Sequence, residues 1–257
     1  MKFKIKTSGL LNVGLFFFII LFSIWSNPSL VPYENGDSIG YINVANDFSD
    51  RSSNDLRSFG YPLIIKLAMI IDKDNWKKSL VLIQIILHAF SILILKKGFK
   101  KIGISNRVSI IISLIIGIHP GLLVYVNYLI AESFLGFLLI LYWYLGISII
   151  QNKNKNILIN ITLMGLISSL SYMVKAVWIL GFATFIIPIF LISKSKNRII
   201  LVLFLFSTMH FSLPFMWENF KFKKSENNKS LRYQSLVVNI NMAAIRLGLI
   251  ETGKGTE

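Results

Sequence analysis

The sequence contains no cysteine, and it has only 12 Asp and Glu residues against 27 Lys and Arg residues in a chain of 257. The missing cysteines exclude a disulfide framework, a thiolate nucleophile and a Cys-ligated zinc site. The GxGxxG, Walker, GxSxG and HExxH motifs are missing as well. The sequence therefore gives no support for nucleotide hydrolysis or for serine or zinc hydrolase chemistry.

Apolar residues dominate what is present. They make up 54% of the chain, and the mean hydropathy is +0.64. This is more apolar surface than a soluble fold of this length needs to bury, so the composition predicts a multi-span membrane protein. The net charge of +15 is also typical of nucleic-acid binders. However, the basic residues fall mainly in short gaps between apolar runs and in the tail, which indicates a membrane topology signal instead.

We expect an all-α bundle of about seven membrane spans. A helix needs about 20 apolar residues to cross a hydrocarbon core of ~30 Å, and several runs lie near the lower limit of this range. The predicted spans cover residues 10–25, 79–95, 108–125, 129–150, 157–173, 177–192 and 199–216. These spans form one module, residues 1–216, followed by a tail, residues 217–257.

The first apolar run follows Lys2, Lys4 and Lys6, as in a signal peptide, but no small-x-small cleavage site follows it. We therefore favour a first membrane span with a cytoplasmic N-terminus over a cleaved signal. With this orientation, the short outside gaps hold only Lys175. The inside gaps hold Lys96, Lys97, Lys100, Lys101, Arg107, Lys153, Lys155, Lys194, Lys196 and Arg198. This asymmetry follows the positive-inside rule.

A long outside loop, residues 27–78, contains the polar and acid-rich stretch 37–62. We expect a short helix over residues 38–48 with Asp37 as its cap, and a second amphipathic helix over 61–71, both at the membrane surface. A helical period places four side chains of the first helix on one face: Tyr41, Val44, Ala45 and Phe48.

Four ionisable residues at the predicted outer edge are candidates for a site. Asp37 is either a helix cap or a general base that takes a proton from an acceptor hydroxyl or amine. Glu132 is either a cap at a positive helix end or part of a site. Lys175 either extends its ammonium to the membrane surface or holds an anionic phosphate. Arg57 is either a solvated loop residue or a phosphate ligand.

The histidines give little support for a metal centre. His88, His119 and His210 show no HxxxH spacing, and no third ligand accompanies them. We interpret all three as structural residues, and we expect neither a metal nor a cofactor.

Several short motifs recur in the same order as in a known family. After the first span come Asp-Ser-x-x-Tyr-x-x-x-Ala at 37–45 and Arg-x-x-Gly-Tyr-Pro at 57–62. Later come Asn-Tyr-Leu-Ile-Ala-Glu-Ser at 127–133 and Ser-Leu-Ser-Tyr-Met-Val-Lys-Ala at 169–176. Along about 200 residues, this order resembles the polytopic GT-C glycosyltransferases. The nearest group is the bacterial relatives of protein O-mannosyltransferases and lipid A aminoarabinose transferases.

The resemblance implies an enzyme of the bacterial inner membrane that transfers a sugar from a polyprenyl-phosphate or polyprenyl-diphosphate donor to a lipid, glycan or protein acceptor at the outer face. It implies that Asp37 is the catalytic carboxylate. It also implies four substrate-binding residues: Arg57, Tyr61, Glu132 and Lys175. Family members usually continue with further spans, so the chain resembles the shared N-terminal module. A fragment, a truncated product and a minimal enzyme with a partner chain all stay open.

Two other functions stay open. A lipid-carrier transporter or flippase accessory would carry charges along the middle of several spans, whereas the ionisable residues here gather at the outer edge. A non-catalytic remnant of a glycosyltransferase would keep the fold without the activity.

Overall fold

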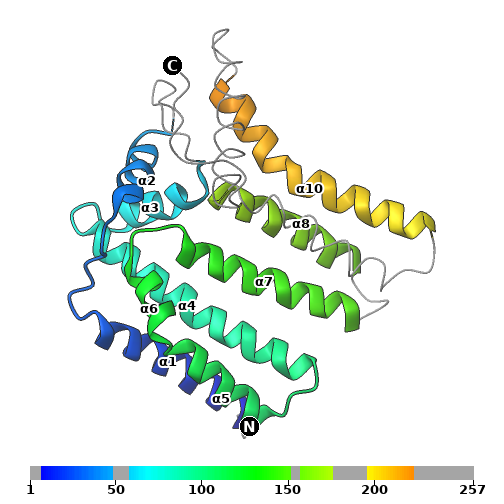
Figure 1. The fold of residues 1–257 in the computed structure, drawn as a ribbon, viewed down its shortest axis with the longest axis horizontal. Helices are drawn as coiled ribbons and strands as arrows, with labels where there is room; N and C mark the ends of the chain where they lie inside the picture. Colours follow the sequence, from blue (N-terminus) through cyan, green and yellow to red (C-terminus); the bar gives the residue numbers. More distant parts are fainter. Residues whose placement is uncertain (1–6, 49–57, 152–156, 176–195, 223–257) are drawn as a thin grey trace, which may run out of the picture.

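A computed structural model describes residues 7–48, 58–151, 157–175 and 196–222 of the chain. These residues form helices joined by short connections, with no strand beyond a single parallel bridge between Tyr33 and Tyr128. Figure 1 shows the long helices lying side by side. The helices are α1 (Thr7–Ser26), α2 (Gly36–Asn46), α3 (Gly60–Ile71), α4 (Trp76–Lys101), α5 (Asn106–Gly117), α6 (Pro120–Asn127), α7 (Glu132–Gln151), α8 (Ile157–Val174) and α10 (Lys196–Phe222).

Five of the described helices, α1, α4, α7, α8 and α10, are long and apolar enough to cross a membrane. The pair α5 and α6 is a sixth candidate if the two helices form one bent span. These apolar helices mark the chain as a multi-pass membrane protein and confirm the predicted all-α bundle. The predicted span over residues 177–192 lies outside the described residues.

The predicted span over residues 108–125 is not one straight helix. It is broken between Gly117 and Pro120, and its two halves meet at a bend of 54°. Proline disfavours a helical conformation for the residue before it and lacks the N–H that would continue the hydrogen-bond ladder. Instead, the ring Nδ1 of His119 accepts the Gly121 N–H at 3.2 Å and caps α6. The His-Pro pair therefore ends one helix and begins the next.

The two helices α8 and α10 run in the same direction. A Cβ on Gly165 would lie 2.7 Å from the Met209 Cβ. Further along both helices, Ser168 Oγ and His210 Nδ1 lie 2.9 Å apart, and Leu213 N–H donates to Ser169 Oγ. The small residues of α8 thus allow close packing against α10, and the two helices present their C-terminal ends at the same end of the bundle (Figure 1).

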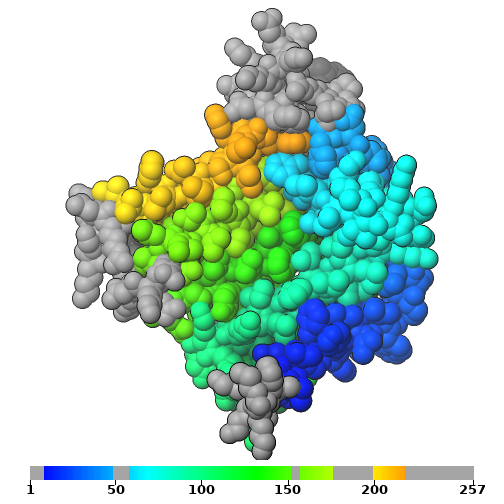
Figure 2. Space-filling model, turned by 180° about the vertical axis from the view of Figure 1, so that it is seen from behind, coloured from blue at the N-terminus to red at the C-terminus, as the bar shows by residue number. Residues whose placement is uncertain are grey.

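The helices α2 and α3 lie together at that end, beside the last turns of α10 (Figures 1 and 2). Their apolar faces pack into a core that also takes side chains from α4, α7, α8 and the segment before α7. Its buried residues are Tyr41, Ala45, Tyr61, Ile65, Ala68, Leu80, Leu129, Ala131, Phe134, Leu138 and Val174. The predicted buried face of α2 is confirmed for Tyr41, Val44 and Ala45, whereas Phe48 lies beyond the helix and is half-buried.

We call this region the site end: α2, α3, the first turn of α7 and the last turn of α8. The opposite region, which we call the basic end, comprises the last two turns of α4, the first turn of α5 and the last turn of α7. Figure 1 shows the two regions at opposite ends of the long helices.

Candidate active site at one end of the bundle

Asp37 lies in the first turn of α2, but it is not the helix cap. The cap is Asn35, whose side-chain Oδ1 accepts the backbone N–H groups of Asp37 and Ser38 at 3.1 and 3.2 Å. The Ser38 Oγ accepts the Asn35 N–H in return and completes a capping box. The predicted cap at Asp37, and a helix starting after it, are therefore wrong. Asp37 itself is exposed in the first turn of α2.

The segment that leads into α2 is fixed to the segment that leads into α7. Tyr33 N–H donates to the Asn127 carbonyl, and Leu129 N–H donates to the Tyr33 carbonyl, both at 2.9 Å. The buried Ser38 hydroxyl donates to the Leu129 carbonyl at 2.8 Å. Because Leu129 lies three residues before Glu132, these bonds set the start of α2, and with it Asp37, relative to the start of α7.

A buried polar network lies beneath the site. Tyr61, which has no exposed surface, donates its hydroxyl proton to Gln84 Oε1 of α4 at 2.8 Å. The Gln84 amide donates in turn to the Val126 and Tyr128 carbonyls at 2.7 and 3.1 Å. Buried polar groups need such partners to avoid a desolvation cost. The network therefore ties α3 and α4 to the connection between α6 and α7.

Glu132 and Lys175 form an ion pair that joins the start of α7 to the end of α8. The Glu132 side chain is 35% exposed and the Lys175 side chain 42% exposed. Glu132 also occupies the first turn of α7, where the helix dipole favours a carboxylate, as the sequence predicted. Lys175 does not simply extend into solvent, because its ammonium meets this carboxylate.

The pKa of the Tyr61 hydroxyl depends on its burial and on its neighbours, including the Glu132 carboxylate. Burial raises the pKa of the Tyr61 hydroxyl, and the neighbouring Tyr41 and Glu132 raise it further, whereas a hydrogen bond with the Ile130 backbone lowers it. The Tyr41 ring lies edge-on to the Tyr61 ring with centroids 5.1 Å apart. Tyr61 is therefore a neutral, fixed hydrogen-bonding group next to the ion pair.

Gly60 and Ser58 bring α3 against the end of α8. A Cβ on Gly60 would lie 2.6 Å from backbone atoms of Met173 and Val174, so only glycine permits this approach. The Ser58 hydroxyl donates to the Met173 carbonyl. These contacts hold Tyr61 close to Lys175, which follows Val174 directly. The structure thus brings Tyr61, Glu132 and Lys175 together, while Arg57 lies outside the described residues.

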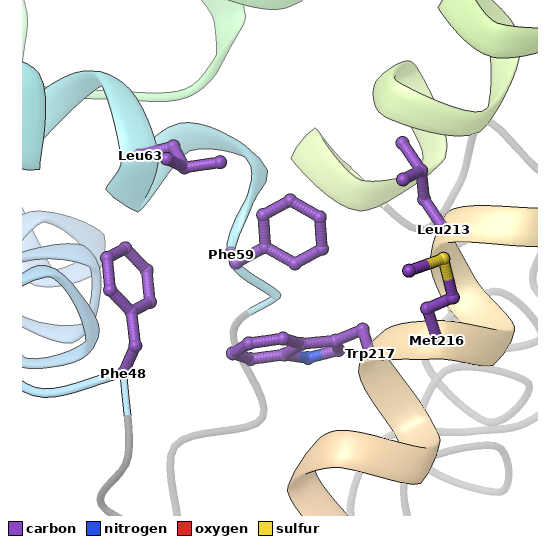
Figure 3. A pocket seen from close by; sticks show the side chains of 6 residues that line it. All are labelled: Phe48, Phe59, Leu63, Leu213, Met216 and Trp217. Carbon is purple, nitrogen blue, oxygen red and sulfur yellow. The ribbon is translucent and has the colours of Figure 1, made fainter.

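An apolar pocket of about 370 Å³ opens at the same end, between α2, α3 and α10. Figure 3 shows the Trp217 indole extending from α10 beneath Phe59, with Phe48 on the α2 side. The ring centroids of Phe59 and Trp217 are 5.0 Å apart. The lining residues are Phe48, Phe59, Leu63, Leu213, Met216 and Trp217. A pocket of this size with an apolar lining is suited to a hydrocarbon chain.

The histidines have structural contacts in the described parts of the chain. His119 caps α6, and His88 Nε2 lies 2.8 Å from the Gly117 carbonyl at the bend. His210 stacks on Phe206 and contacts Ser168. Among the described residues, no three His, Asp or Glu side chains gather as metal ligands would.

The sequence reasoning missed Asn35, Ser38 and Gln84. Asn35 three residues before Ser38 is a recognisable capping pattern. Gln84 is an amide inside an apolar run, which signals a buried partner. Neither signal alone, however, identifies Tyr61 as the partner of Gln84.

Comparison of the chain with protein-family models and with curated proteins gives no match.

Proposed function

We propose that the chain is a GT-C-type membrane glycosyltransferase that moves a sugar from a polyprenyl-phosphate donor to an acceptor at the outer face of the membrane. One observation carries the proposal: the Glu132–Lys175 ion pair and Tyr61 gather at the same end of the bundle as Asp37 and an apolar pocket. Such a donor needs charged groups for its phosphate and an apolar surface for its chain. The motif order at residues 37–176 supports the same class.

In this proposal, Asp37 is the general base. An acceptor hydroxyl or amine attacks the anomeric carbon of the sugar while its proton passes to the Asp37 carboxylate. The bond between the anomeric carbon and the phosphate oxygen breaks, and the polyprenyl phosphate leaves with the electron pair. Asp37 suits this role because it is exposed and Asn35, not Asp37, caps α2.

Lys175 is the proposed partner of the leaving phosphate. A lysine ammonium has three N–H donors, and Glu132 accepts one of them. Phosphate oxygens can accept the others, since no second acceptor for this ammonium is seen in the described part of the chain, and fixed cations stabilise the negative charge that develops on a leaving group. Arg57 would add a second cation, and Glu132 would help to shape the sugar or acceptor pocket, with the buried Tyr61 fixed beneath it.

The apolar pocket is the proposed binding site for the first isoprenoid units of the donor. Its lining is aromatic and aliphatic. On one side are α2, which carries Asp37, and α3, which carries Tyr61; on the other side is α10, which has an exposed apolar face. A lipid chain could therefore pass from the bilayer along α10 into the pocket while its phosphate stays at the polar site.

A second candidate, a lipid-carrier transporter or flippase accessory, is favoured by the break between α5 and α6. Discontinuous membrane helices often line substrate sites in transporters. However, the described acidic side chains lie at the site end, not in the middle of the spans. A non-catalytic remnant is the third possibility.

The proposal is tested by transfer of labelled sugar from a panel of polyprenyl-phosphate sugars, in membranes that contain the full chain. We expect Asp37→Asn to lower the transfer rate by on the order of 100-fold, a loss typical of a missing general base. The matched control is Asp74→Asn, an exposed acid at the same end, which should leave the rate unchanged.

The outcomes separate the candidates. Equal rates for Asp37→Asn and the parent chain would contradict the general-base role. Movement of the lipid carrier across the membrane without sugar transfer would favour the transporter. A folded, inserted chain that does neither would be a remnant or would need a partner chain.

A further inference from the structure

The basic end carries a cluster of cations that the proposed function does not use. Its members are Lys96, Lys97, Lys100 and Lys101 in the last two turns of α4 and Arg107 in the first turn of α5. Lys97, Lys100 and Lys101 are spaced i, i+3 and i+4, so they share one face of α4. Lys97, Lys100 and Arg107 are exposed.

These lysines are not needed to cap α4. Ile102 and Ile104 donate their backbone N–H groups to the Gly98 and Phe99 carbonyls at 3.1 and 3.0 Å. Gly103 N–H donates to the Lys100 carbonyl at 3.2 Å, and the Gln151 amide donates to the Lys101 carbonyl. Because the final carbonyls already have partners, the ammonium groups remain available for another ligand.

The two less exposed lysines contact only neutral groups in the described part of the chain. Lys96, which is 3% exposed, donates to Asn12 Oδ1 at 2.5 Å. Lys101 donates to Ser148 Oγ at 2.5 Å and lies 4.5 Å from the centroid of the Tyr144 ring. These contacts position the cations without neutralising their charge.

The described helices around this cluster carry no acidic side chain near it. Between Asp74 and Glu218 the only acidic residue is Glu132, at the opposite end of α7. The two ion pairs seen among the described residues, Glu34 with Lys77 and Glu132 with Lys175, also lie away from the basic end. The described residues therefore supply no anion to balance the charge of the cluster.

We propose that the basic end binds the headgroup of an anionic phospholipid. The cluster lies mainly at the C-terminal end of α4, an apolar helix long enough to cross a membrane, and lipid phosphates meet a membrane protein at the ends of its spans. Basic clusters at this position and basic pockets between membrane helices bind anionic headgroups. The acyl chains of the same lipid lie along exposed apolar residues of α5, including Val108 and Ile111. This contact between headgroup, chains and protein distinguishes a lipid from a free anion.

The test is a titration of the full chain with phosphatidylglycerol and phosphatidylcholine in detergent micelles, in which native mass spectrometry counts the bound lipids. The double variant Lys97→Gln/Lys100→Gln removes two exposed charges and keeps the bonded Lys96 and Lys101. Each basic residue near an anionic surface contributes roughly fivefold in affinity. We therefore expect this variant to bind phosphatidylglycerol on the order of 25-fold more weakly, with phosphatidylcholine unaffected.

The matched control is Lys73→Gln/Lys78→Gln, which removes two exposed lysines from the opposite end of the bundle. It should bind phosphatidylglycerol as the parent chain does. Equal loss in both double variants would overturn the proposal, because net charge and not a site would then explain binding. A parent chain that binds both lipids equally would overturn it too. So would inorganic phosphate that displaces the lipid at comparable concentration, because this would indicate a simple anion site.

Discussion

The two ends of the bundle differ in how their charges are arranged. At the site end, Glu132 meets Lys175 and Glu34 meets Lys77, and a buried network from Tyr61 through Gln84 lies beneath them. At the basic end, Lys96 and Lys101 contact only neutral groups among the described residues. The site end also has two extra short helices and an apolar pocket, whereas the basic end consists of helix ends and the turn between α4 and α5.

The difference is that the polar groups of the site end are fixed relative to one another, whereas the basic end presents cations that we propose to bind an external anion. Paired and hydrogen-bonded groups hold a defined geometry, which chemistry requires. Cations without an acidic partner attract anions but impose little geometry on them. The ends should therefore respond differently to the same kind of substitution.

The largest expected effect comes from adding one methyl group at each end. In Gly60→Ala the new Cβ would meet backbone atoms of Met173 and Val174 at 2.6 Å, which no side-chain rotation relieves. We expect a loss of about 3 kcal/mol in the free energy of unfolding. In Gly98→Ala the Cβ would meet the Trp143 ring, which can turn away, and alanine favours the helix interior. We expect a loss of about 1 kcal/mol or less.

Thermal unfolding of the purified variants in detergent measures this contrast. Gly36→Ala is the control, because a Cβ there meets nothing within 4 Å. If Gly98→Ala is less stable than Gly60→Ala, the prediction is contradicted, because the packing around Gly60 at the site end would then be looser than the packing around Gly98 at the basic end.

A smaller effect is expected from filling the apolar pocket. Leu63 lines the pocket and Leu67, one turn later on α3, does not, although each is 45% exposed. We expect Leu63→Trp to raise the KM for the polyprenyl donor by about tenfold, because the indole would occupy space that the lipid chain needs. Leu67→Trp should leave the KM unchanged.

Steady-state transfer assays with donors of different chain length measure the effect. The rise in KM should be smaller for a donor with a very short lipid chain. Equal KM values for the two variants would mean that the pocket does not take part in donor binding.

Much of the fold follows from the order of apolar and basic residues. The runs that become α1, α4, α7, α8 and α10 could be predicted because membrane helices must be long and apolar. The buried face of α2 could be predicted from the helical spacing of Tyr41, Val44 and Ala45. The first-turn position of Glu132 also follows from the apolar run after it.

The candidate site could be predicted only as a set of residues near one face. The pairing of Glu132 with Lys175 depends on how α7 and α8 pack, and these residues are 43 positions apart. The bond between Tyr61 and Gln84 likewise depends on the packing of α3 against α4. The cap at Asn35 could have been found locally, because its side chain and Ser38 form a capping box.

The comparison of the two ends is tested most directly by asking which side of the membrane each faces. The chain has no cysteine, so single cysteines report position without interference. Ile39→Cys lies on α2 at the site end, and Ile102→Cys lies just after α4 at the basic end. These isoleucines are 62% and 51% exposed. Labelling of intact cells with a membrane-impermeant maleimide should modify Ile39→Cys, and it should modify Ile102→Cys only after permeabilisation. Labelling of both positions from the same side, or in the reverse order, would contradict an outer-face active site opposite a cytoplasmic basic end.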